Sequence, residues 1–275
     1  MTITILIDNA LPPNSNLVAE HGLSIHVDTG VKKFLCDTGA SGLFAENARA
    51  LDIDFAQCDF AFISHGHNDH SGGLARFFET GGDNKVYMHR SILHNQYYSS
   101  RREVKRDISC DKNILESNKE RIRLIDSNMK ISDGIYAVRC RHDRFPKPYG
   151  NRFLTRNDGT SELLDDFGHE ISLALTTPEG LVIISPCSHN GVMNIIHDCC
   201  MTAGCSKVHA FIGGFHFVES DRCITEAETF AESINALYPD TLFYTGHCTC
   251  DTAKGVLAGK LKNITFFVTG TKIDI

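Results

Sequence analysis

The sequence predicts a mixed α/β fold in which two β-sheets pack together and helices cover their outer faces. Three observations lead to this prediction. Short apolar runs typical of strands recur in both halves of the chain, stretches with helical spacing of apolar residues lie between them, and a charged central segment separates the halves. The chain has 275 residues, 42% of them hydrophobic, so it can bury a substantial core between such layers.

The first half of the chain begins as a meander of short strands separated by turn residues. The expected strands cover residues 3–7, 23–27, 33–36, 60–64 and 85–89. The expected helices cover residues 43–51 and 74–80, where apolar positions follow helical spacing. The strand 60–64 is wholly apolar except for its last residue, and it leads directly into His65.

The central segment is basic on an otherwise acidic chain. Residues 90–156 hold 16 Lys and Arg against 8 Asp and Glu, whereas the whole chain has a net charge of −7. We expect 90–130 to be mostly helical or irregular, and the Pro and Gly residues in 139–162 predict a loop or lid. The prediction is one domain, 1–275, with an insertion or lid at about 90–165. The segment either attracts an anionic substrate or is simply a solvated helical surface.

Histidines follow the strands of the second half as well as His65. The expected strands cover residues 171–176, 181–185, 208–212, 242–245 and 264–268, with helices near 190–203 and 225–237. His189, His216 and His247 each lie shortly after one of these strands. Loops at strand ends commonly carry active-site residues. One such His is more often structural, but four of them indicate a functional site.

The run HGHNDH at residues 65–70 is the strongest local signal. On a tight loop, His65 and His67 can share one metal ion. Asp69 and His70 can then turn toward a second ion. Imidazole and carboxylate ligands suit zinc, iron and manganese. The sequence therefore predicts an enzyme with two divalent metal ions, zinc first and iron or manganese as alternatives.

The run SHGHNDHSGGL resembles the signature of the metallo-β-lactamase fold superfamily, and further segments agree with it in order. These segments are EHGLSIHVDTGVKKFLCDTG, CSHNG, GGFHF and TGHCTC. Together they resemble the branch that includes dihydropterin-aminobenzene-ribofuranosyl-phosphate synthase of methanopterin biosynthesis. The resemblance covers nearly the whole chain. It implies a four-layer αββα sandwich with the metal ions at one edge.

The resemblance also implies roles for individual residues. One metal ion would be bound by His65, His67 and His189, and the other by Asp69, His70 and His247. Asp69 and His216 would take part in catalysis, His216 by contacting the substrate. Asp37 would orient a metal ligand through a hydrogen bond, although a turn-stabilising role is the alternative. The phosphate-binding candidates in the lid are Arg141, Arg144, Lys147 and Arg152. No bridging carboxylate is evident.

The implied function is metal-assisted transfer, or attack by metal-activated water, on an anionic small molecule of phosphorylated or pterin type. The synthase of this branch would condense an aryl-ribose phosphate with a pterin and release pyrophosphate. A lactonase, another ester hydrolase or a phosphodiester hydrolase on the same fold is the first alternative. A non-catalytic metal-binding protein is the second. The sequence contains neither a GxxxxGK[ST] loop nor a convincing GxGxxG, which disfavours nucleotide-driven and nicotinamide chemistry.

Composition bounds the location and the partners. No apolar stretch approaches the roughly 18–20 residues that a membrane span needs, and the N-terminal residues lack the pattern of a secretion signal. We therefore expect a cytoplasmic protein whose eleven Cys are mostly thiols. The acidic chain disfavours a nucleic-acid partner. A homo-oligomer is left open.

Overall fold

The protein is described by a computed structural model that covers residues 1–79, 82–101 and 103–275. The chain divides into two compact units. Unit 1 contains Met1–Asp126, Thr155–Leu164 and Phe267–Ile275, and unit 2 contains Ser127–Leu154 and Asp165–Phe266. The segment expected as an insertion, residues 90–165, contributes to both units. The single-domain organisation stays a prediction.

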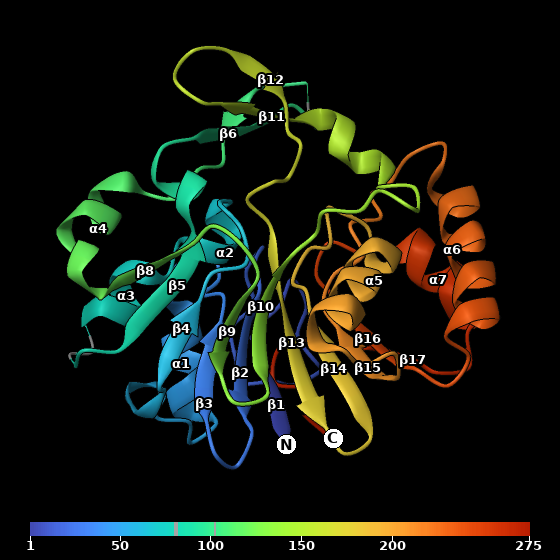
Figure 1. Cartoon of the computed structure of the whole chain (residues 1–275), viewed down its shortest axis with the longest axis horizontal. Coiled ribbons are helices and arrows are strands. Elements are labelled where there is room, and N and C mark those ends of the chain that lie inside the picture. The colour runs from blue at the N-terminus through green and yellow to red at the C-terminus, as the bar shows by residue number, and fades with distance from the viewer. Residues whose placement is uncertain (80–81, 102) are drawn as a thin grey trace. The chain divides into compact units, whose positions relative to one another are not determined.

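Unit 1 is built on a seven-stranded sheet of order β18-β1-β2-β3-β4-β5-β8 (Figure 1). Its strands are β1 Thr2–Ile7, β2 Ser24–Asp28, β3 Lys33–Cys36, β4 Phe60–Phe62, β5 Lys85–His89, β8 Ile122–Ile125 and β18 Lys272–Asp274. The pairs from β18 to β3 are antiparallel, and those from β3 to β8 are parallel. Since parallel strands end at one edge of a sheet, the loops after β3 and β4 meet there.

Helices cover one face of this sheet and complete its core. The helices of unit 1 are α1 Leu43–Ala50, α2 Asn68–Ser71, α3 Leu74–Glu79 and α4 Lys112–Ser117, with 3₁₀ turns η1 Phe55–Gln57, η2 Arg90–Leu93 and η3 Lys119–Arg121. Phe44 of α1 and Phe77 of α3 are buried in one cluster with Leu35, Ala61 and Val86 of the strands. Alternate strand residues thus face the helices, as expected for a sheet covered on that side.

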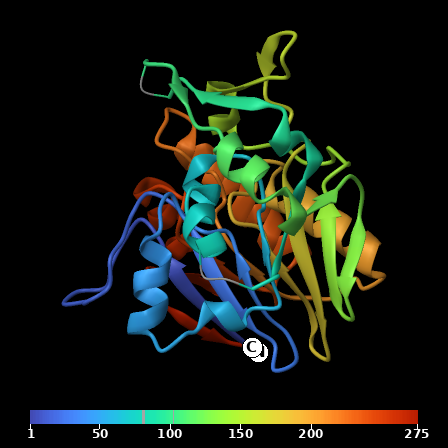
Figure 2. The same cartoon turned by 90° about the vertical axis from the view of Figure 1, so that its left-hand side faces the viewer.

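A small sheet of order β12-β11-β6-β7 also belongs largely to unit 1 (Figure 2). Its strands are β6 Gln96–Ser99, β7 Arg106–Asp107, β11 Leu154–Asn157 and β12 Glu162–Leu164. Lys105 and Glu162 form an ion pair that joins its two ends. Residues 90–130 are mostly helical or irregular, as expected, but they also hold β6, β7 and β8, which the sequence does not predict. β6 and β7 are short and mostly polar, and Arg123 interrupts the apolar residues of β8, so no continuous apolar run marks these strands.

Unit 2 contains a second seven-stranded sheet, of order β17-β16-β15-β14-β13-β10-β9. Its strands are β9 Met129–Ser132, β10 Ile135–Arg139, β13 Ile171–Thr177, β14 Gly180–Ile184, β15 Val208–Ile212, β16 Leu242–Thr245 and β17 Ile264–Phe266. The pairs from β9 to β14 are antiparallel, and those from β14 to β17 are parallel. The loops after β14, β15 and β16 therefore meet at one sheet edge.

Three long helices pack on this second sheet (Figure 1). They are α5 Val192–Ala203, α6 Cys223–Leu237 and α7 Asp251–Lys260, and the 3₁₀ turn η4 covers Tyr149–Phe153. Ile196, Phe230 and Leu257, one from each helix, are buried in a cluster with Phe211 and Phe243 of the strands. This cluster fixes the helices on the sheet whose loops carry the histidines.

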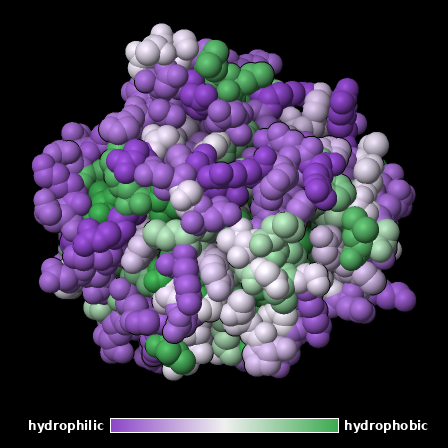
Figure 3. Space-filling model, viewed as in Figure 1, coloured by the Kyte–Doolittle hydropathy of each residue, from purple (hydrophilic) through white to green (hydrophobic). Residues whose placement is uncertain are grey.

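The mixed α/β class and the principal strands and helices expected from the sequence are confirmed. The helix expected over residues 74–80 is α3, but Thr80 lies outside the described residues. None of the eleven Cys is in a disulfide, as expected. Within the described ranges, no helix is long and apolar enough to cross a membrane. Hydrophilic residues predominate on the face drawn in Figure 3, with hydrophobic ones scattered among them.

Candidate metal centre

In unit 1, a buried hydrogen-bond network joins the loops after β3 and β4. Asp37 follows β3 and is fully buried. Its Oδ1 accepts from the Ser64 N–H at 2.7 Å, and its Oδ2 accepts from the Ser64 hydroxyl at 2.7 Å. The same Oδ2 lies 2.7 Å from Nδ1 of His70. Ser64 Oγ is in turn 2.8 Å from Nδ1 of His65.

This network determines which nitrogen of each imidazole carries the proton. An ionised carboxylate only accepts hydrogen bonds, so His70 must donate from Nδ1 to Asp37. The single proton of the Ser64 hydroxyl goes to Asp37, so His65 also donates from Nδ1. Both imidazoles therefore carry the lone pair on Nε2. Metal-binding histidines usually show this arrangement, in which the other ring nitrogen is held by a carboxylate or a similar acceptor.

His67 and Asp69 complete the cluster of unit 1. The His65 ring lies between two others, with its centroid 4.5 Å from that of His67 and 4.2 Å from that of His70. Asp69 Oδ2 is 3.7 Å from His70 Nε2, close enough for both to bind one ion. His67 is the N-cap residue of the short helix α2, so Asp69 and His70 stand on a helical turn rather than on the loop expected from the sequence. The four predicted ligands of unit 1 are thus brought together.

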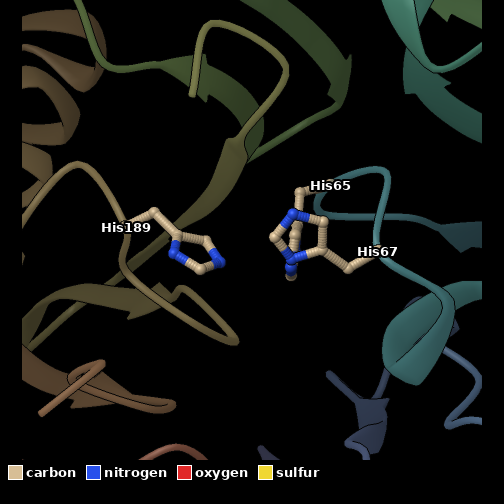
Figure 4. A group of neighbouring side chains, drawn as sticks. All are labelled: His65, His67 and His189. Carbon is tan, nitrogen blue, oxygen red and sulfur yellow. The ribbon is translucent and has the colours of Figure 1, made fainter. Parts of the chain in front are cut away.

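Gly66 permits this crowding. A Cβ at Gly66 would lie 2.3 Å from Cε2 of Tyr97, whose ring packs edge-on to His67 at 5.7 Å between centroids. Only glycine fits between the two histidines. Figure 4 shows His65 and His67 on this loop after β4, and His189 on the loop after β14 in unit 2.

In unit 2, His189 is fixed by three neighbours. Its Nδ1 lies 3.2 Å from Asn151 Oδ1, and the Asn151 amide donates to the His189 carbonyl oxygen at 2.7 Å. With the amide oxygen as acceptor, His189 also carries its lone pair on Nε2. Glu170 Oε1 accepts from the His189 N–H at 2.7 Å. The Phe167 ring stacks on the imidazole at 4.4 Å and 8°.

His216 and His247 follow the neighbouring strands β15 and β16, and both are buried. The His216 ring lies 4.1 Å from the His189 ring. Two thiols join His216. One ligand atom each from Cys187, Cys248 and His216 lie within 4.8 Å of one another, and the two Sγ atoms are 3.3 Å apart. Burial raises the pKa of Cys248, but Cys187 and the adjacent His247 and His216 lower it well below its usual value.

Several of these loop residues adopt the left-handed backbone conformation, which costs energy for residues other than glycine. The φ angles are 61° at Asp37, 59° at Ser188, 54° at His216 and 46° at Cys248. Ser188 and Cys248 adjoin the predicted ligands His189 and His247. Asp37 hydrogen-bonds to the predicted ligand His70, and His216 is itself predicted to contact the substrate. Backbone strain of this kind is concentrated at functional sites, where neighbouring structure holds it in place.

The four basic residues expected to bind phosphate lie in different surroundings. Arg141, Arg144 and Arg152 are exposed. The Arg152 guanidinium stacks over the Tyr149 ring at 3.6 Å. Lys147 is half-buried and pairs with Asp143 at 3.0 Å. Their role toward a substrate stays a prediction.

Sequence reasoning did not identify several residues that hold the ligands. Ser64 adjoins His65 but gives no signal of its role, and Asn151, Phe167 and Glu170 lie 38, 22 and 19 positions before His189. The sequence predicts only thiols at Cys187 and Cys248. The available signal for a further role is their place in the CSHNG and TGHCTC motifs, close to His189 and His247.

Comparisons with known proteins show the family of the chain. The family model described as the metallo-beta-lactamase superfamily matches residues 17–173, more than half of the chain. A protein of Methanocaldococcus jannaschii named 7,8-dihydropterin-6-methyl-4-(beta-D-ribofuranosyl)-aminobenzene-5'-phosphate synthase is 28% identical over 269 residues. The match covers 90% of this chain and 87% of that protein.

Solved structures are similar over the full length. Tm1679, described as a metal-dependent hydrolase of the beta-lactamase superfamily, is 29% identical with a TM-score of 0.83, covering 100% of this chain and 99% of that one. Zinc-bound PqqB from Methylobacterium extorquens has a TM-score of 0.57 at 12% identity, with 100% of both chains covered, and is similar in fold alone. The expected metallo-β-lactamase fold is confirmed.

Proposed function

Because the chain belongs to the metallo-β-lactamase superfamily, we propose that it is an enzyme whose histidine-bearing loops bind two divalent metal ions. The proposed ligands are His65, His67 and His189 for one ion, and Asp69, His70 and His247 for the other. Zinc is the first expectation, and iron or manganese are the alternatives. The observation that carries this proposal is the anchoring of Nδ1 in His65, His70 and His189, which leaves the lone pair on Nε2.

Individual side chains are proposed to orient the metal ligands, contact the substrate and transfer a proton. Bound divalent ions supply a Lewis acid for a substrate oxygen. Asp37 holds the imidazole of His70, and Ser64 holds that of His65. Asn151 holds the imidazole of His189, and Glu170 holds the backbone N–H of the same residue. His216, beside His189, is proposed to contact the substrate and to move a proton. Asp69 is proposed to act both as a ligand and in positioning the reacting group.

The proposed reaction is the condensation implied by the synthase branch. The substrate is an anionic small molecule of phosphorylated or pterin type. A C–N bond forms between the methylene carbon of a pterin and an aryl amine, the C–O bond to pyrophosphate breaks, and the amine loses a proton. His216 is proposed to accept that proton. Lys147 and the exposed Arg141, Arg144 and Arg152 are proposed to attract the phosphate groups.

Hydrolysis is the second candidate function. The similarity to Tm1679, described as a metal-dependent hydrolase, favours it. The substrate would then be a lactone, another ester or a phosphodiester, and His216 would serve the leaving group. A metal-binding protein without catalysis would retain the ions and turn over none of these substrates.

Metal content and a substrate panel test the proposal together. Protein purified without oxygen should contain close to two transition-metal ions per chain by elemental analysis. His67→Ala should lose metal and turnover together, whereas His94→Ala, at an exposed position outside the cluster, should lose neither. Pyrophosphate release from a pterin diphosphate with an aryl amine supports the synthase, and cleavage of lactones or phosphodiesters supports the hydrolase. Metal-free wild-type protein would overturn the proposal.

The cytoplasmic location and the absence of a nucleic-acid partner remain predictions beside this proposal, and a homo-oligomer is left open.

A further inference from the structure

Unit 2 contains a cavity of about 510 Å³ next to the loops of His189 and His216. It lies between the segment before η4, the start of α5 and the face of α6. Its aromatic lining consists of Phe145, Tyr149, Phe215, Phe217 and Phe230. Phe215 and Phe217 flank His216 in the sequence, and Gly191 at its wall lies two positions after His189. Small-molecule sites are typically of this size, largely apolar, with a few placed polar groups.

One carboxylate lines this apolar cavity. Glu226 of α6 accepts from the Tyr149 N–H through Oε1 at 2.7 Å. Its other oxygen, Oε2, is shielded from solvent and has no hydrogen-bond partner among the described residues. Burial raises the pKa of Glu226 to about 7. A buried acceptor that nothing satisfies is costly, so a ligand that donates hydrogen bonds at this point would relieve the cost.

The chemistry of the wall defines the ligand class. Aromatic side chains favour a flat ring, which can stack on them. A carboxylate with one oxygen already held by the backbone is suited to a pair of adjacent N–H groups, as in the aminopyrimidinone edge shared by pterins and guanines. Lys147 and Arg222 also line the cavity, and they favour an anionic group on the ligand over a cationic one.

We propose that this cavity binds the fused aminopyrimidinone ring of a pterin, with Glu226 accepting hydrogen bonds from its amino edge. The inference rests on the proposed function, because it takes the pterin-type substrate from it and assigns that ring to a place. A ring seated here has the His189 and His216 loops at its border. The reacting substituent can then extend toward those loops while the ring stays among the aromatic side chains.

Binding without turnover tests this inference. The fluorescence of pterin is titrated with the protein as purified, near pH 8. The same titration is made with Glu226→Gln and with the matched control Glu232→Gln, at an exposed position of the same helix. Loss of a hydrogen bond to a charged acceptor should weaken pterin binding by about 10- to 100-fold in Glu226→Gln. Glu232→Gln should bind as the wild type does, and thermal unfolding checks that both variants fold.

Two further ligands keep the test decisive if Glu226→Gln does not fold. Lumazine, which has a carbonyl oxygen in place of the pterin 2-amino group, should bind the wild type at least about tenfold more weakly than pterin. Guanosine should bind more weakly than pterin. Equal binding of pterin and lumazine, no pterin binding, or preference for guanosine would overturn the inference. Failure of the proposed function is a different result: pterin would bind through Glu226 while no condensation occurs.

Discussion

Replacing Asp37 by Asn should weaken metal binding without disturbing the backbone. Asp37 accepts three hydrogen bonds at 2.7 Å, two from Ser64 and one from His70. An asparagine has one acceptor oxygen and one donor amide. If the oxygen keeps the Ser64 N–H, the amide faces His70 Nδ1 and favours the tautomer protonated at Nε2. That tautomer cannot bind a metal through Nε2.

The magnitude follows from the bonds that are lost. A hydrogen bond to a charged group contributes about 1.5–3 kcal/mol, and at about 1.4 kcal/mol per tenfold this is about 10- to 100-fold in affinity. Mutations of carboxylates that orient metal-bound histidines cost about the same. We therefore expect the metal dissociation constant of Asp37→Asn to rise about 10- to 100-fold.

Competition with a chromophoric chelator measures this constant. The matched control is Asp52→Asn, because Asp52 is exposed and has φ 58°, close to the 61° of Asp37. Asn tolerates this conformation well, so backbone strain affects both variants alike. An Asp37→Asn protein that folds and binds metal within twofold of the wild type would refute the orienting role.

Three further predictions concern unit 2. His216→Gln should retain metal by elemental analysis but lose at least about 100-fold in turnover, the usual contribution of a proton-transferring group; unchanged turnover would exclude it from proton transfer. Burial raises the pKa of Glu226 to about 7, so the folded protein favours the protonated carboxyl. The contribution of this group to folding stability is therefore fully present below about pH 4.5 and is lost as the pH rises through 7. Glu226→Gln should therefore match the wild type in urea unfolding near pH 4.5 and exceed it by about 1–2 kcal/mol at pH 8, after discounting for solvent access; a constant difference would contradict this. Gly150→Ala should lose about 1–3 kcal/mol in the same assay, because its Cβ would lie 2.9 Å from both Val218 methyl carbons and 3.2 Å from His216 Cδ2; an unchanged unfolding midpoint would show that Val218 moves aside easily.

The parts of the fold that the sequence predicts are those with an apolar signature. Strand 60–64 and the helix at 43–51 are visible because burial selects their residues. β8, Ile122–Ile125, is different, because it carries an exposed Arg123 and lies at the edge of its sheet. α7, Asp251–Lys260, contains two Gly, which weaken its helical pattern. These elements are specified by their partners in the fold more than by their own residues.

The candidate site divides in the same way. The candidate histidines can be recognised from the sequence because each lies in a motif that directly follows an apolar strand, as His65 does. Glu226 is not, because its environment depends on the Tyr149 amide 77 positions earlier in the chain. The same holds for Asn151 and Glu170, whose contacts with His189 exist only in the folded chain. Ordinary polar residues gain such roles from long-range packing, which single-sequence patterns do not encode.

The left-handed residues Ser188, His216 and Cys248 have a consequence for how the protein can evolve. Each costs about 1–2 kcal/mol relative to a right-handed residue. Glycine would remove that cost, but at Ser188 and Cys248 it would also loosen the loops that position the adjacent imidazoles. At His216 it would remove the imidazole itself. Selection for thermal stability therefore favours glycine at these three positions, whereas selection for activity favours the present residues. Thermostable variants should accumulate their substitutions in the sheet and helices of unit 2. Added stability there would compensate for the strain in these loops.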